Sequence, residues 1–118
     1  MGAPRGEGFR VVLRKVARRS DLLPQQGKVV ILDDRVVALF RVGERFYALS
    51  NTCPHRGGSL GEGELEGFVV TCPWHGWQFD CRTGQAVENS AIQVKSYPVH
   101  VEGDDIYIEW PDVESVSR

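Results

Sequence analysis

Two cysteine–histidine pairs, separated by sixteen residues, limit what this chain can fold into more than any other feature of its sequence. The first pair is Cys53 and His55 in NTCPHRGG, and the second is Cys72 and His75 in TCPWHGWQFD. Because proline and glycine surround both pairs, we expect each pair to lie in a tight loop. Two thiolates and two imidazoles form a four-ligand set for a metal centre. The fold must therefore bring two separate loops to one point.

Short apolar, β-branched stretches separated by turn residues surround these loops. They predict strands over 9–16, 28–32, 35–42, 45–50, 68–71 and 77–79, and a late hairpin formed by 94–101 and 106–110. No window of helical period is long enough to predict a major helix. The predicted class is therefore all-β, a compact antiparallel sandwich or barrel.

The segment 51–67 breaks this pattern, because it is rich in glycine and has few apolar side chains. We expect it to be a long loop that offers little to the core, and such loops are usually functional or disordered. Within it, Glu62, Glu64 and Glu66 alternate along the chain. We expect a solvated face there, with an acidic docking patch as the alternative.

The length of 118 residues suits one domain, and the formal net charge of −2 argues against nucleic acid as a partner. The sequence has no apolar run of membrane-spanning length and no signal-peptide region, so we expect no membrane partner and a cytoplasmic location. The three cysteines are Cys53, Cys72 and Cys81. An odd count speaks against a disulfide framework and leaves metal binding open.

Three kinds of centre compete for the two pairs. A structural zinc site accepts two thiolates and two imidazoles, but it usually groups cysteines with cysteines and histidines with histidines. A catalytic Cys–His dyad would leave the second pair unexplained. A 2Fe–2S cluster with cysteines on one iron and histidines on the other takes one residue of each type from each loop, as here.

The motifs CPHRGG and CPWHGWQFD resemble the two cluster-binding loops of Rieske iron–sulfur proteins, and the downstream RTG and YPV–GDDIYI segments resemble their closing strands. This resemblance covers about residues 9–110. It implies one Rieske-type 2Fe–2S cluster, with Cys53 and Cys72 on one iron and His55 and His75 on the other. It implies no catalytic residue of the chain's own.

The resemblance also implies a single Rieske domain over 1–118. Its antiparallel base would span about 9–50 and 80–110, the inserted cluster-binding lobe about 51–79, and a polar tail 111–118. Trp74 and Trp77 would then flank the cluster, although ordinary core packing is an equal alternative for both. Cys81 is expected to be a buried structural thiol, and His100 a surface histidine on a strand.

A Rieske oxygenase subunit also needs a mononuclear iron, usually held by two histidines and a carboxylate. The chain has three histidines, and the cluster takes two, so only His100 remains. The resemblance therefore implies a small one-electron carrier that passes electrons from a flavin-containing reductase to a terminal oxygenase or another oxidoreductase subunit. Two alternatives remain open: the small subunit of an assimilatory NAD(P)H nitrite reductase, and a zinc-stabilised interaction module.

The high-potential Rieske proteins of cytochrome bc complexes have an extra disulfide-forming cysteine in each loop, and a serine and a tyrosine after the second histidine. In this sequence Gly58 and Trp74 lie in the regions of the two cysteines, and Trp77 and Phe79 replace the hydroxyl residues. Fewer hydrogen-bond donors stabilise the reduced cluster less. The sequence therefore predicts a reduction potential on the order of −150 mV, at the low end of the Rieske range.

Overall fold

The computed structural model describes residues 11–54, 58–74 and 76–111 of the chain. It consists of strands and two short 3-10 helices, so the all-β prediction is confirmed. The elements are β1 (Val11–Arg18), η1 (Arg19–Asp21), β2 (Gln26–Leu32), β3 (Arg35–Val42), β4 (Arg45–Ser50), η2 (Leu60–Glu62), β5 (Glu64–Glu66), β6 (Val69–Thr71), β7 (Gln78–Asp80), β8 (Ser96–Tyr97), β9 (Val99–Glu102) and β10 (Asp105–Pro111). No helix in the described part of the chain has the length and apolar character needed to cross a membrane.

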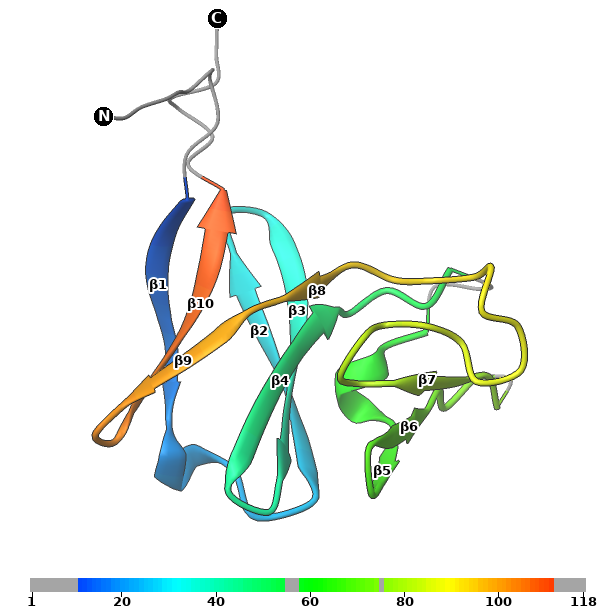
Figure 1. Cartoon of the computed structure of the whole chain (residues 1–118), viewed down its shortest axis with the longest axis horizontal. Coiled ribbons are helices and arrows are strands. Elements are labelled where there is room, and N and C mark those ends of the chain that lie inside the picture. The colour runs from blue at the N-terminus through cyan, green and yellow to red at the C-terminus, as the bar shows by residue number, and fades with distance from the viewer. Residues whose placement is uncertain (1–10, 55–57, 75, 112–118) are drawn as a thin grey trace, which may run out of the picture.

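The strands form three antiparallel sheets, with the orders β1-β10-β9, β2-β3-β4-β8 and β5-β6-β7. Figure 1 shows the first two sheets close together and the small third sheet on one flank. The third sheet contains the strands on either side of the second cysteine–histidine pair. The bounds of the expected base and lobe stay a prediction; β7 crosses the expected boundary and ends at Asp80.

Strand β3 connects two hydrophobic cores because both of its faces are buried. Ala38 and Phe40 belong to a core that also contains residues of β5, β6 and β7, whereas Val37 and Leu39 face a second core with β10. Since successive side chains of a strand point to opposite faces, one apolar run can serve both cores. This explains why RVVALFRV is almost continuously apolar rather than alternating.

The segment expected as one strand over 94–101 forms two strands, β8 and β9, separated by Pro98. β8 pairs with β4, whereas β9 pairs with β10. Proline has no backbone N–H to donate to a sheet. The break therefore falls where the chain passes from one sheet to the next.

The prediction that 51–67 offers little to the core was wrong. This segment contains η2 and β5, and its Leu60 and Leu65 are 0% and 8% exposed. Leu65 pairs with Val70 of β6, so its burial depends on a partner strand that the local sequence does not reveal. The same segment packs closely on β2, because a Cβ atom on Gly27 would lie 2.8 Å from the carbonyl oxygen of Gly61.

Candidate metal centre

The second predicted ligand loop connects β6 to β7. These strands pair from Val69 opposite Asp80 to Thr71 opposite Gln78, so the hairpin leaves Cys72 at the start of its loop. The backbone N–H of Cys72 donates to the carbonyl of Trp77 at 2.7 Å, and Gly76 N–H donates to the carbonyl of Cys72 at 3.1 Å. The loop is therefore closed at both ends by its own backbone.

The first predicted ligand loop is closed in the same way. An antiparallel bridge pairs Thr52 with Ser59, and the N–H of Cys53 donates to the carbonyl of Gly58 at 2.9 Å. In both loops the cysteine amide thus bonds to the carbonyl five residues further along the chain. The two loops share one backbone pattern, although their histidine spacings differ.

Gly58 brings the two loops into contact. A Cβ atom on this residue would lie only 2.6 Å from Sγ of Cys72, and 3.2 Å from Cβ and Cγ of Trp74. No carbon side chain fits against sulfur at that distance, so the contact requires glycine. Because Cys53 bonds to Gly58 and Gly58 lies against Cys72, the structure brings both predicted cysteine ligands to one place.

The two predicted histidine ligands, His55 and His75, lie outside the described residues, as do Arg56 and Gly57. Within the described part of the chain, no group of three or more histidine, cysteine, aspartate or glutamate side chains is placed to hold a metal ion. The assignment of all four ligands therefore stays a prediction.

Comparison with known proteins decides the family. Residues 13–98 match the Rieske [2Fe-2S] domain. This chain belongs to the Rieske family. The predicted cofactor, a Rieske-type 2Fe–2S cluster, is therefore confirmed along with the family resemblance.

Relatives of this Rieske protein include the 3-phenylpropionate/cinnamic acid dioxygenase ferredoxin subunit of Escherichia coli K12. It is 41% identical over 92 residues, which cover 75% of this chain and 87% of the relative. A ferredoxin solved in a complex of reduced oxygenase and oxidised ferredoxin in carbazole 1,9a-dioxygenase is 34% identical, with a TM-score of 0.76 over 81% of this chain and 91% of its own. A Mycobacterium tuberculosis protein described provisionally as an NADH-dependent nitrite reductase small subunit is 26% identical, with a TM-score of 0.78 over 86% and 96% of the two chains.

The surroundings of the two cysteines fit such a cluster. Cys53 and Cys72 are each 2% exposed and lie in the core shared by β3 and the third sheet. A bare thiolate in that apolar setting would be costly, whereas a thiolate bound to a ferric ion has its charge compensated. Two buried sulfurs beside the loops that carry two imidazoles match the mixed donor set of a Rieske cluster.

The two tryptophans of the second loop have different environments in the Rieske chain. Trp77 packs against the core containing the cysteines, and its ring centroid lies 6.4 Å from that of Phe79. Trp74 is 63% exposed, so it is not part of the core. Its Cβ and Cγ nevertheless lie close to Gly58, as Sγ of Cys72 does, so the start of the Trp74 side chain lies where the two loops meet.

Cys81 and His100, which were not predicted to be ligands, lie where the sequence analysis expected them: Cys81 is buried and His100 is on the surface of a strand. Cys81 is 1% exposed, and burial, followed by the charge of Asp80, raises the pKa of its thiol to about 12. His100 is exposed on β9, and its Nε2 lies 2.8 Å from Oε2 of Glu109 on β10. Neither side chain is needed to complete the ligand set.

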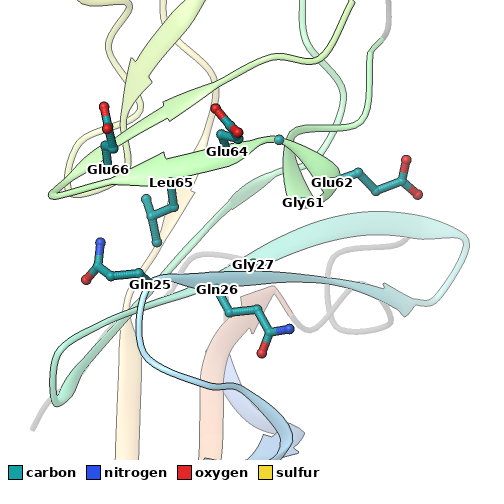
Figure 2. Close-up of a pocket in the computed structure, with 9 residues that line it drawn as sticks. Gln25, Gln26, Gly27, Gly61, Glu62, Glu64, Leu65 and Glu66 are labelled. Atoms are coloured by element: carbon teal, nitrogen blue, oxygen red, sulfur yellow. The ribbon is translucent and has the colours of Figure 1, made fainter.

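The three alternating glutamates line an open cleft of about 560 Å³ between β5 and the start of β2. Figure 2 shows Glu64 and Glu66 pointing away from β2, whereas Leu65 points toward it. Glu62, Glu64 and Glu66 are all exposed, as expected for a solvated face. Their use as a docking patch stays a prediction.

Sequence reasoning missed two residues that support the loops. Asn51 is 6% exposed, and its side chain accepts a hydrogen bond from the segment that follows the first loop. Arg82 places its Cζ 4.1 Å from the ring centroid of Phe68. Arg82 also donates to both carboxylate oxygens of Asp80 and thereby lowers the pKa of that carboxyl. The position of Asn51, between an apolar strand and a ligand cysteine, was the one available signal for it.

Proposed function

We propose that this chain is a one-electron carrier whose cluster is held by Cys53, His55, Cys72 and His75. The observation that carries the proposal is the contact of Gly58 with Cys72, which joins the two loops containing these residues. When bound, a Rieske cluster accepts and releases single electrons. The chain supplies two buried thiolates, two imidazoles, and backbone-closed loops that hold the sulfurs in place.

The proposed donor is a flavin-containing reductase and the proposed acceptor a terminal oxygenase. Support comes from the similarity to a dioxygenase ferredoxin subunit and to a ferredoxin solved with its oxygenase. No further iron site is proposed, because His100, the one histidine outside the predicted ligand set, pairs with Glu109 on the surface. We propose a cytoplasmic location, which is supported by the odd number of cysteines in the sequence, because an odd count speaks against a disulfide framework.

The ligand assignment is tested with single alanine variants of the anaerobically purified protein. We expect about two irons and two sulfides per wild-type chain, and a Rieske EPR signal after reduction. Cys53→Ala, His55→Ala, Cys72→Ala and His75→Ala should each lose that signal. Cys81→Ala and His100→Ala are matched controls of the same residue types and should keep it. A native signal in Cys72→Ala, or zinc in place of iron and sulfide, would overturn the proposal.

The second candidate function, a nitrite reductase small subunit, is favoured by the fold similarity to the Mycobacterium tuberculosis protein. The two roles differ in how tightly the partner is held. A carrier should purify alone and, once reduced, transfer its electron to an oxygenase at a rate that rises with oxygenase concentration. Stable co-purification with a large sirohaem-containing subunit would favour the second role.

A further inference from the structure

Asn51 has the environment of a residue with a specific structural task. It follows β4 directly and precedes Cys53 by two positions. It is also the one buried polar side chain among the described residues, with 6% of its surface exposed. Burying an amide is costly unless its donors and acceptors are satisfied by partners.

The hydrogen-bond partners of Asn51 come from β3 and from the segment that follows the first ligand loop. Its backbone N–H donates to the carbonyl of Val36 at 3.0 Å, and its backbone carbonyl accepts from Leu60 N–H at 2.9 Å. Its side-chain Oδ1 accepts from Gly61 N–H at 2.7 Å, and Nδ2 donates to Oγ of Ser59 at 2.9 Å. One residue thus ties β3 to the first turn of η2.

These bonds begin a short ladder that continues into the loop. Asn51 bonds to Leu60, Thr52 bridges Ser59, and Cys53 bonds to Gly58. Each step moves one residue along both chain segments. The register fixed at Asn51 therefore decides which residue lies against Sγ of Cys72.

The space beside the Asn51 side chain at position 61 admits only a glycine. A Cβ atom on Gly61 would lie 3.0 Å from Oδ1 of Asn51 and 2.7 Å from Cγ2 of Val29. A larger residue at 61 would push η2 away and lengthen the 2.7 Å hydrogen bond. A slip of the ladder by one residue would place Leu60 or Glu62 there instead, so the pairing with Gly61 selects the register.

We propose that Asn51 is a positioning residue for the cluster centre: its amide, through Ser59 and Gly61, holds the register that places Gly58 against Cys72. This inference rests on the proposed ligand assignment, because it concerns how the first ligand loop is aligned with the second. The side-chain amide of Asn51 bonds to Ser59 and Gly61, and neither of these is a predicted ligand. Its effect on the cluster is therefore indirect.

The test compares Asn51→Ala and Asn51→Asp with the wild type and with Ile108→Ala. Asp keeps an oxygen for the Gly61 N–H and can accept from the Ser59 hydroxyl, whereas Ala keeps neither contact. Ile108 is fully buried in the second core, so its truncation lowers stability without touching the loop. Two quantities are measured on each purified protein: hydrogen exchange at the amides of Leu60 and Gly61, and the EPR g-values of the reduced cluster.

We expect Asn51→Ala to speed exchange at Gly61 by about tenfold or more, because its buried N–H loses the side-chain acceptor. Exchange at Leu60, whose acceptor is the backbone carbonyl of residue 51, should speed up less. The g-values of Asn51→Ala should shift, and Asn51→Asp should fall between Ala and wild type in both measurements. Ile108→Ala should lower the melting temperature and leave the g-values unchanged. If Asn51→Ala fails to fold, the inference is tested by comparing the exchange rates and g-values of Asn51→Asp with those of the wild type.

Wild-type exchange and g-values in both Asn51 variants would overturn the inference. That result would leave the ligand assignment standing, since the latter depends on Cys72→Ala and its companions. Conversely, if the ligand variants disproved the ligand assignment, the exchange result would still be valid, because measuring exchange needs no electron transfer and no bound cluster.

Discussion

At the scale of single residues, Gly58 is the most constrained position in the candidate centre. Its carbonyl closes the first loop, and its Cα faces the sulfur of the second. The sequence does not reveal that Gly58 lies against Sγ of Cys72, because this contact joins residues fourteen positions apart.

We predict that Gly58→Ala lowers the iron content below half of the wild-type value. The added carbon would lie 2.6 Å from Sγ of Cys72, so either the sulfur or the loop must move. Overpacking of this kind costs roughly 1–3 kcal/mol. Iron and sulfide analysis and thermal unfolding check the result.

Gly43→Ala is the matched control for this prediction. Gly43 has a φ of 61° and no atom within 4 Å of an added Cβ. Its substitution should cost about 1 kcal/mol through backbone strain and keep the full iron content. Equal iron in both variants would show that the Gly58 contact does not matter for the cluster.

We predict that the Cys81 thiol resists alkylation in the folded protein at pH 8. Its pKa of about 12 lies far above that pH, so almost none of it is the reactive thiolate, and its side chain is buried. Mass spectrometry after iodoacetamide treatment should find Cys81 unmodified, with the urea-unfolded protein as the control. Modification at equal rates in both states would contradict its assignment as a structural thiol.

At the scale of elements, the strands were more predictable than the connections between them. The runs at 28–32, 35–42 and 45–50 were confirmed as β2, β3 and β4, because apolar β-branched residues flanked by turns indicate strands locally. Leu60 and Leu65 could not be recognised as core residues, since glycines and glutamates surround them and their burial depends on packing against distant strands. The role of Asn51 was not predicted for the same reason, because Gly61, whose N–H donates to the Asn51 side chain, lies beyond the loop.

The turn after β7 depends on an ion pair within it. Arg82 Nη2 lies 2.8 Å from Oδ2 of Asp80, and the same guanidinium stacks on Phe68. Hydrogen bonds from Arg82 lower the pKa of Asp80 relative to its ordinary value. The carboxylate form therefore stabilises the folded state above the unfolded pKa, and this contribution is lost as the pH falls through the folded pKa.

We predict that Asp80→Asn lowers the free energy of unfolding by about 0.5–1 kcal/mol at pH 7, since the pair is partly exposed. The difference between wild type and variant should shrink as the pH falls from about 4, the ordinary pKa of an aspartate in the unfolded chain, through the lower pKa of Asp80 in the folded protein. Urea unfolding followed by circular dichroism at matched pH values measures this difference. A difference that stays constant down to the lowest accessible pH would show that the charge of Asp80 is not the cause.

At the scale of the whole molecule, the family was readable from the sequence, because each loop contains its own motif, whereas the four ligands stay a prediction. The sequence also predicted that the two loops meet, but it did not show which residues make their contact. That contact depends on Gly58, on the ladder from Asn51, and on the core that β3 shares with the third sheet.

We predict a reduction potential on the order of −150 mV for the purified protein. Trp77 and Phe79 occupy the positions of the hydroxyl residues of high-potential relatives, and Phe79 is fully buried in the core, where it donates no hydrogen bond. With fewer donors, the added negative charge of the reduced cluster is stabilised less. Redox titration followed by circular dichroism or EPR measures the midpoint, and a value well above zero would contradict the prediction.

The close approach of Gly27 to Gly61 has a consequence for how electrons would be delivered. Backbone touches backbone there, and one continuous core runs from β3 and β4 to β6 and β7. Such a junction favours movement of the third sheet and the other two sheets as one body, so the proposed cluster site would reach its donor and its acceptor together with the whole molecule. Each turnover then requires the entire molecule to leave one partner and find the next by diffusion, which ties the rate to encounter frequency and to the ionic strength of the medium.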